Sequence, residues 1–295
     1  MTSSVDATAP SNRTSANIGG PQTVVLADRV RKRHPLRCLF CVSLLFICSL
    51  AAADNLPQLT SCLEQAQTEK VTIARVTDGD TVVLDDQRRV RLIGLNTLEL
   101  NSPDKQDRLM AQHAKEALEN FLENTQALII SGKDAHDRYG RLLAHLRRAD
   151  GQDAAQTLIA TGMGLAVAVG RNTRCADTLH TLELQARDAG LGIWQSPGSW
   201  QLNSSPLTGR ERGFHVATGH VQEIQGHKGK TKLILDNGLQ VKLGSLWPKS
   251  GELAASELSK LIGQEIQVRG WLGTSAGKQS LTLNHPSNLE LTNNS

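Results

Sequence analysis

The sequence contains few aromatic side chains. Phe, Trp and Tyr make up 3% of its 295 residues, and Tyr139 is the single tyrosine. A surface that binds ligands mainly by stacking on many rings is therefore not expected. Apolar residues at 39% and charged residues at 21% are ordinary for a globular protein, and the length allows one or two domains.

The chain also lacks a strong excess of either charge. Its formal net charge is +3. Residues 1–53 contain six Lys or Arg and two Asp, so the rest of the chain carries a formal charge of −1. A general attraction to nucleic acid is excluded for this remainder, and any such contact requires a local basic patch.

A long apolar run occurs at one place, residues 36–50. Basic residues precede this run, and the small residues of positions 51–53 follow it. The layout predicts a cleavable signal peptide over residues 1–53, with a long polar start at 1–28, and export of the rest of the chain. An uncleaved N-terminal anchor is the alternative. No later segment is apolar enough to span a membrane.

Cysteine is sparse as well. Three of the five cysteines lie within the predicted signal peptide, which leaves Cys62 and Cys175. Because exported proteins fold in an oxidising compartment, we expect a disulfide between these two residues. Two free thiols are the alternative.

The chain after a polar lead-in at residues 54–70 begins with a region of mixed secondary structure. Residues 71–195 predict three strands, a helix, two strands and two further helices, in that order. Ser102 and Pro103 open the first of these helices as a cap and a helix-starting proline. The pattern indicates a mainly β domain with helices.

A second region follows a segment rich in Ser, Pro and Gly. That segment, residues 196–213, has no periodicity and predicts a linker. In residues 214–293, strand-like runs flank Asn237 and Gly238, a strong hairpin signal. We expect a second small β-barrel-like domain there, of the OB type.

Charged residues stand at unusual places among the strands of the first region. Arg91 lies within an apolar strand, and a guanidinium in such surroundings needs a partner. An ion pair with a nearby carboxylate is one reading, and a cleft that receives an anion is the other. The acidic turn at Asp80, the later Glu99 and the basic turn at Arg141 supply further charges.

Three motifs in this region together resemble a known family. They are DGDT at 78–81, VRLIGLNTLE at 90–99 and DRYGR at 137–141. In this order, on this succession of strands and helices, they are similar to the staphylococcal nuclease (thermonuclease) family over residues 71–195. The resemblance implies a five-stranded OB-type barrel with three helices. It also implies calcium-dependent hydrolysis of phosphodiester bonds in DNA and RNA.

The resemblance also implies roles for individual residues. Arg91 and Arg141 would bind the scissile phosphate and the charge that grows on it, because guanidinium groups pair with phosphate oxygens. Glu99 would be the general base or position the attacking water. Arg138 and Tyr139 lie where the family contacts the nucleotide.

A divalent cation, most often Ca²⁺, would be held by oxygen atoms of Asp80, Asn96 and Thr97. Asn96 stands where well-known members have a second aspartate, and Leu98 stands where a proline is usual. An amide oxygen can bind calcium but carries no charge, so weaker metal binding is expected. Residues 164–172 lack the tyrosines with which some members stack on a base, so binding should depend more on phosphate contacts.

The function expected from these features is an exported, monomeric, metal-dependent nuclease of low sequence specificity, with DNA, RNA or both as substrate. A non-catalytic module on the same fold, binding nucleic acid or protein, is the alternative. A glutamate retained beside two arginines favours the enzyme, because a binding module does not need it. A purely structural envelope protein has no support beyond the presence of a second domain.

Overall fold

The structure is a computed structural model, and it describes residues 60–63, 66–203, 206–227, 230–248, 258–275 and 277–292. The predicted signal peptide lies outside these residues. Among the described helices, none has the length and apolar character needed to cross a bilayer. The residues that the structure describes all belong to one compact unit.

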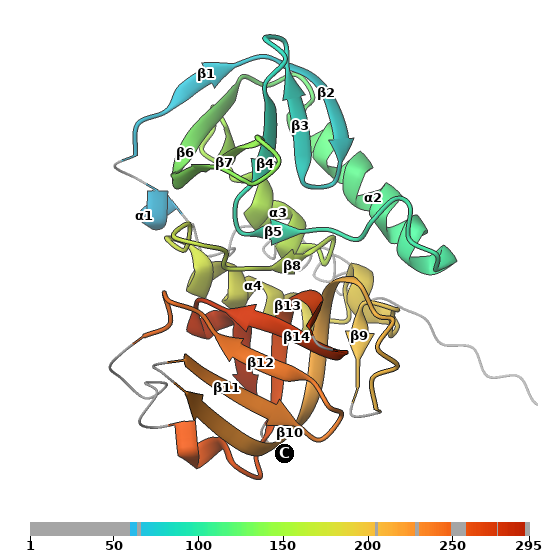
Figure 1. Cartoon of the computed structure of the whole chain (residues 1–295). Helices are drawn as coiled ribbons and strands as arrows, with labels where there is room; N and C mark the ends of the chain where they lie inside the picture. The colour runs from blue at the N-terminus through green and yellow to red at the C-terminus, as the bar shows by residue number, and fades with distance from the viewer. Residues whose placement is uncertain are drawn as a thin grey trace, which may run out of the picture. The chain divides into compact units, whose positions relative to one another are not determined.

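Six strands form the first sheet, in the spatial order β1-β6-β7-β4-β3-β2. Only Thr72 separates β1 from β2, so the two are halves of one bent strand, with one half at each edge of the sheet. The sheet therefore curls on itself as a five-stranded barrel, in which β4 and β7 run parallel (Figure 1). The strands are β1 Glu69–Val71, β2 Ile73–Asp78, β3 Thr81–Leu84, β4 Arg89–Leu92, β6 Ala127–His136 and β7 Leu142–Arg148.

Helices accompany this barrel, and α2 packs alongside β2 (Figure 1). The N-cap of α2 is Asp104 and not Ser102, because the Asp104 carboxylate accepts hydrogen bonds from the backbone N–H groups of Gln106 and Asp107. The predicted fold of a barrel with three helices is confirmed by α2, α3 and α4, and the short α1 precedes the barrel. The helices are α1 Thr60–Leu63, α2 Lys105–Leu122, α3 Ala154–Ala160, α4 Ala176–Asp188 and the 3-10 turn η1 Gly192–Gln195.

The predicted disulfide is confirmed. Cys62 in α1 is bonded to Cys175, the residue just before α4, with their Cα atoms 5.6 Å apart. Cys175 belongs to the apolar core that α3, α4 and the barrel strands share, and the partly buried Cys62 packs against this core. The bond closes a loop between residues separated by 113 positions.

The second sheet is also a closed ring of five strands. β10 pairs with both β11 and β13, which gives the order β10-β11-β12-β14-β13 with β12 parallel to β14. The predicted hairpin is present, with Gly238 at φ +87° in the turn between β11 and β12. The elements are β9 Gln201–Leu202, β10 Gly213–His227, β11 Lys230–Leu235, β12 Gln240–Leu243, η2 Leu258–Leu261, β13 Glu265–Ser275, β14 Lys278–Leu283, η3 Pro286–Asn288 and β15 Leu289–Leu291.

The segment between the two barrels is more ordered than a free linker. Trp200 is buried and packs edge-to-face on Trp194, with ring centroids 5.1 Å apart. β9 follows it and pairs with β10. The large apolar surface of Trp200 is the physical reason that this part of residues 196–213 is held in place.

Buried charges join the second barrel to α4. Arg269 of β13 is 1% exposed and pairs with Glu183 of α4 and Glu290 of β15. Arg187 of α4 pairs with the same two carboxylates. Two guanidinium groups thus neutralise two carboxylates, as a buried ion cluster requires.

Candidate active site

The predicted site residues come from three segments of the first barrel that the strand register brings together. Arg91 on β4 lies opposite Thr81 on β3 and opposite Leu143 on β7. The acidic turn before β3 and the basic turn before β7 therefore flank the same strand. This is the local reason that residues far apart in the sequence meet here.

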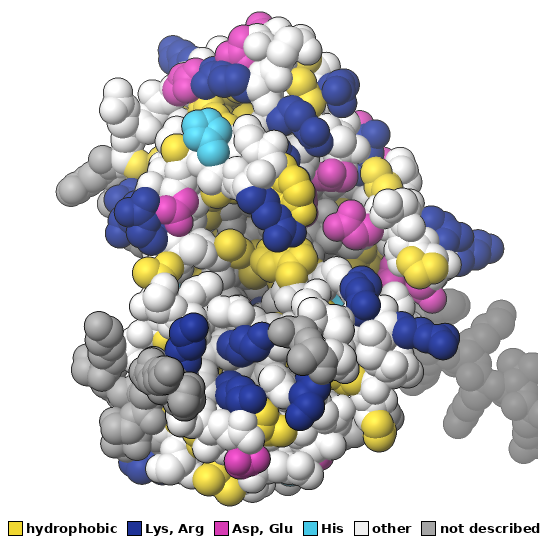
Figure 2. All heavy atoms as spheres, viewed as in Figure 1, with side chains coloured by type: hydrophobic (Ala, Val, Ile, Leu, Met, Phe, Trp, Pro, Cys, Tyr) yellow, Lys and Arg dark blue, Asp and Glu magenta, His cyan; other side chains and the backbone are white. Residues whose placement is uncertain are grey.

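Five of the predicted residues line one cleft of about 600 Å³. They are Arg91, Glu99, Arg138, Tyr139 and Arg141. On the face drawn in Figure 2, apolar side chains gather in a hollow, with basic and acidic side chains close by. Asp80, Asn96 and Thr97 are buried and do not line the cleft.

The guanidinium of Arg91 is held by oxygen atoms of the protein. Its Nη1 donates to the carbonyls of Leu92 and Leu95, at 3.1 and 2.7 Å. Its Nη2 donates to Oδ1 of Asn96 and lies 3.0 Å from Oδ2 of Asp80. The guanidinium thus donates three hydrogen bonds and forms an ion pair with Asp80, and its Nε–H has no acceptor among the described residues. The ion pair considered from the sequence is present.

A tight turn after β4 makes this arrangement possible. Gly94 adopts φ +83°, and a Cβ at this position would lie 2.3 Å from the side chain of Leu179. Only glycine satisfies both conditions without strain. The turn brings the Leu95 carbonyl and the Asn96 side chain back to Arg91.

Asp80 is the centre of the buried part of the site. Its Oδ1 accepts from the hydroxyl of Thr81, and its Oδ2 accepts from the N–H and hydroxyl of Thr97. Burial and the charge of Asp80 raise the pKa of the neighbouring Asp78 to about 6. The acidic turn therefore concentrates negative charge that Arg91 only partly balances.

Glu99 lies at the cleft without a side-chain partner. Among the described residues it forms no side-chain hydrogen bond and no ion pair, although it feels the charges of both arginines. Desolvation of the carboxylate and the nearby Asp80 raise its pKa, against the opposing effects of Arg91 and Arg141. Its oxygens are free to accept a proton or to orient a water molecule.

Arg141 is held by the turn that precedes β7. The carboxylate of Asp137 accepts hydrogen bonds from the backbone N–H groups of Tyr139 and Arg141, and from Nε of Arg141 at 2.7 Å. Partial burial acts to raise the pKa of Asp137, but these hydrogen bonds outweigh it and lower the pKa below its ordinary value. Nη1 of Arg141 reaches Thr81 at 3.5 Å, and its Nη2 has no acceptor in the part of the chain that the structure describes.

Tyr139 presents its ring to solvent, being 69% exposed. The guanidinium of Arg138 lies 4.8 Å from the ring centre and that of Arg141 lies 5.7 Å from it. Arg138 also donates to the tyrosine hydroxyl at 2.6 Å. These three side chains form a basic and aromatic edge of the cleft.

Several residues of the cleft were not singled out from the sequence, and one of them, Trp271, belongs to the second barrel. Along β13, Ile266 and Val268 face the barrel core, whereas Arg269 and Trp271 alternate with them and face outward. The apolar Val167 and Val169 line the same cleft. A tryptophan on the polar face of a predicted strand is the signal that could have drawn attention to it.

The buried oxygens fit a hard divalent cation in type, although they provide little charge. Asp80 contributes a carboxylate, Asn96 an amide oxygen and Thr97 a carbonyl, and Ca²⁺ prefers all three kinds of ligand. The same Nη2 atom of Arg91 lies 3.0 Å from oxygens of both Asp80 and Asn96, so this guanidinium competes with a cation for them. The donor set therefore fits a weakly held ion.

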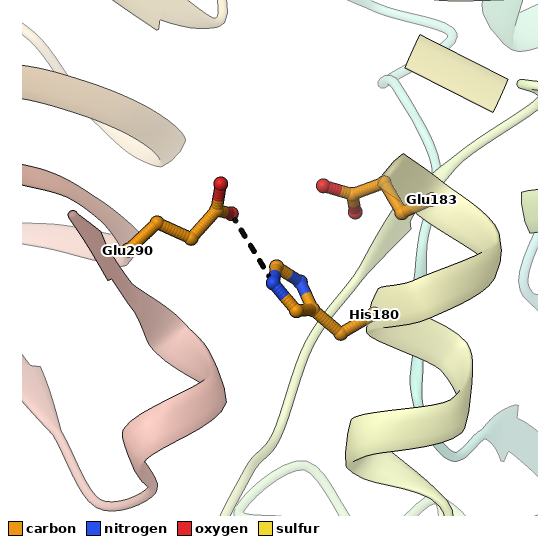
Figure 3. Close-up of side chains that lie close together, drawn as sticks. All are labelled: His180, Glu183 and Glu290. Atoms are coloured by element: carbon orange, nitrogen blue, oxygen red, sulfur yellow. Dashed lines mark ion pairs between the residues drawn. The ribbon is translucent and has the colours of Figure 1, made fainter. Parts of the chain in front are cut away.

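A second polar cluster has the spacing of a metal site. His180, Glu183 and Glu290 offer ligand atoms within 4.8 Å of one another (Figure 3). In Figure 3, His180 and Glu183 project from the same helix toward Glu290 on the other chain segment. Because Arg187 and Arg269 already pair with both carboxylates, this cluster is an interior ion network, not a vacant cation site.

Comparison with known proteins identifies the first barrel region. Residues 89–196 match the family described as staphylococcal nuclease homologue. The chain carries a staphylococcal nuclease domain. The matched residues include Arg91, Asn96, Glu99 and Arg141, and Asp80 lies just before them.

Two curated relatives of the staphylococcal nuclease domain are thermonucleases. The protein from Staphylococcus hyicus is 25% identical over 143 residues, which cover 48% of this chain and 84% of the relative. The protein from Staphylococcus intermedius is 27% identical over 130 residues, which cover 43% of this chain and 77% of the relative. The second barrel lies beyond the residues that match the family.

Proposed function

We propose that this protein is an exported, metal-dependent nuclease that hydrolyses phosphodiester bonds in DNA, RNA or both with low sequence specificity. The observation that carries the proposal is the shared cleft of Arg91, Glu99 and Arg141, with the oxygens of Asp80 and Asn96 behind it. Similarity to thermonucleases supports the same chemistry.

Arg141 is the main phosphate ligand in this proposal. Its Nη2 has no acceptor among the described residues. Its Nε donates to the carboxylate of Asp137, and this hydrogen bond fixes the direction of the guanidinium group. Arg91 adds a half-buried positive charge at the cleft and its Nε–H. Both groups stabilise the negative charge that grows on the phosphate oxygens when the new bond forms.

Glu99 takes the proton of the attacking water. It has no competing partner in the described chain, and its raised pKa makes it a stronger base than a glutamate with an ordinary pKa. Because it forms no ion pair with either arginine, a phosphate and a water molecule can lie between these groups. Asp80, Asn96 and Thr97 would hold a Ca²⁺ ion, which supplies further positive charge and orients water.

A binding module without catalysis is the second candidate, and a specific observation favours it. Arg91 donates three hydrogen bonds to the protein itself and forms an ion pair with Asp80, and two of these contacts are to oxygens of the candidate metal ligands. With Asn96 in place of an acid, the site can be stable without a cation. The module would bind nucleic acid through Arg138, Tyr139 and Arg141.

Cleavage assays separate these two candidates. The purified protein is incubated with plasmid and single-stranded DNA and with RNA, in Ca²⁺, Mg²⁺, Mn²⁺ or a chelator. We expect metal-dependent cleavage that Glu99→Gln and Arg141→Ala abolish, whereas Glu116→Gln and Arg210→Ala, at exposed positions away from the cleft, leave it unchanged. Binding without cleavage in every metal would refute the enzyme and support the module.

Export has its own support in the disulfide, since such bonds persist in oxidising compartments. The test is cell fractionation of the complete chain beside a variant that lacks residues 36–50. We expect the complete chain outside the cytoplasm, and the variant inside it with Cys62 and Cys175 reduced. The same location for both proteins would contradict export by this segment.

A further inference from the structure

Trp271 brings an aromatic ring of the second barrel to the cleft of the first. It lines the same 600 Å³ cleft as Arg91, Glu99 and Arg141, and it is 45% exposed. The cleft residue Val169 is likewise 46% exposed, so this side of the cleft presents apolar surface to solvent. Exposed apolar surface that lines a cleft is typical of a ligand site.

The ring is held from behind. Trp271 lies opposite Phe214 in the β10–β13 pairing, and the two rings meet edge-to-face with centroids 5.0 Å apart. Phe214 itself packs on the apolar cluster that contains Leu98, Trp200 and Val216. Such a supported ring loses little freedom when a ligand stacks on it.

The strand that carries Trp271 is also fixed in register. Two residues before it, on the same face of β13, Arg269 is buried and pairs with Glu183 of α4 and Glu290 of β15. Asn288 adds a pair of hydrogen bonds to the backbone of Ala168, close to the cleft residues Val167 and Val169. The contact between the two barrels therefore places the indole at the cleft.

We propose that Trp271 stacks on a nucleobase of the bound strand, so that the second barrel completes the substrate site of the nuclease domain. The proposal rests on the proposed function, because it places a nucleobase beside the phosphate that the two arginines would bind. The cleft presents guanidinium groups for a phosphate and, in Trp271, Val167 and Val169, an apolar wall for a planar group. Every base has a face that stacks, so the contact adds affinity without sequence preference.

A binding experiment in chelator tests this contact without cleavage. The probes are a short single-stranded DNA and the same strand in which abasic sugars replace the bases, measured by fluorescence anisotropy. We expect Trp271→Ala to weaken binding of the normal strand by about tenfold, within the range found for base–aromatic stacking. Binding of the abasic strand should not change, and Trp271→Phe should restore most of the affinity.

A matched control excludes a general effect of removing exposed apolar surface. Leu246 of the second barrel is also 45% exposed and does not line the cleft, so Leu246→Ala should bind both strands as the unaltered protein does. Equal binding of the normal strand by the unaltered protein and Trp271→Ala would overturn the proposal. An equal loss on normal and abasic strands would overturn it as well, because the tryptophan would then act on structure alone.

The two proposals fail in different ways. If the protein cleaves nucleic acid but Trp271→Ala leaves both its binding and its KM unchanged, the stacking contact is wrong and the nuclease stands. If no metal supports cleavage but the base-dependent loss of binding is observed, the nuclease is wrong and the stacking contact stands. In a cleaving protein we expect Trp271→Ala to raise KM about tenfold with little change in kcat.

Discussion

The two barrels share a strand order but not a chemistry. The third strand of the first barrel, β4, reads Arg-Val-Arg-Leu, and its counterpart in the second, β12, reads Gln-Val-Lys-Leu. Each runs parallel to the fifth strand of its own barrel. Arg91 and Lys242 hold the same place in these strands, yet Arg91 meets Asp80 and Asn96 whereas Lys242 donates to the hydroxyl of Ser280.

This difference arises in the turns and not in the strands. The first barrel has an acidic turn before β3 and a basic one before β7, and both flank β4. The second barrel carries its buried arginine, Arg269, on the outer face of β13 and uses it for attachment to α4. A shared fold therefore does not carry a shared function, which depends on the residues placed on it.

The sharpest test of the comparison concerns the disulfide, because no cysteine follows Cys175 in the sequence. Cys175→Ser should lower the free energy of unfolding by about 4–5 kcal/mol, given a loop of 113 residues. The measurement is urea denaturation with and without reductant. The double variant at Cys62 and Cys175 serves as the control and should not respond to reductant. An equal midpoint for the oxidised and reduced protein would contradict the prediction.

Removal of the second barrel's buried charge should have the next largest effect. Arg269→Met leaves Arg187 as the one arginine that pairs with Glu183 and Glu290 among the described residues, and should lower the free energy of unfolding by about 3 kcal/mol. Thermal unfolding measures the loss, and Arg212→Met, at an exposed position, should cost little. If the two variants are equally stable, the ion cluster does not hold the barrel in place.

A cation that lines the cleft of the first barrel and a cation of the second barrel should differ in their effect on cleavage. Arg141→Ala should reduce kcat by about 10²–10³, because it removes a donor from the developing phosphate charge. Lys242→Ala, in the second barrel, should leave kcat unchanged while both proteins keep their melting temperature. A similar loss in both variants would show that the second barrel takes part in the chemistry.

The smallest effect concerns pH. Asp153 caps α3, and burial raises its pKa to about 6 although a backbone hydrogen bond from Gln156 acts in the other direction. The folded state therefore holds this proton more tightly than the unfolded state, and stability falls as the pH rises from about 4 to 6. Asp153→Asn keeps a capping side chain without the charge and should remove this slope.

At pH 7 the Asp153→Asn variant should be more stable than the original protein by about 1–3 kcal/mol. Denaturation at a series of pH values measures both quantities. Asp85→Asn, at an exposed turn, is the control and should leave the slope in place. A lower stability for Asp153→Asn at pH 7 would mean that the charged form is the favoured one.

Much of the first barrel was predictable because its signals are local. Strand and helix periodicity gave the element order, and the three motifs named five residues that line one cleft. The hydrogen bonds that fix the Arg91 guanidinium were not predictable in detail, because they depend on the turn at Gly94 and on two backbone carbonyls. Every residue has a backbone carbonyl, so the residue types in the sequence do not indicate which carbonyls accept these hydrogen bonds.

The presence of a second-barrel residue at the cleft was not predicted, and the reason is different. Trp271 reaches the cleft through the docking of β13 on α4, which depends on Arg269 meeting Glu183 across 86 positions of sequence. Trp200 likewise orders part of a segment whose composition is that of a linker. Long-range packing of single large side chains leaves no periodic trace in the sequence.

The bent strand formed by β1 and β2 also affects the tendency of the protein to aggregate at high concentration. Because its halves pair with β6 and β3, both borders of the first sheet belong to one short stretch of chain. Free sheet borders recruit other chains into shared sheets and aggregates. Detachment of this one strand would expose the facing borders of β6 and β3 together, so the protection of this barrel against edge-to-edge aggregation depends on one short stretch of chain.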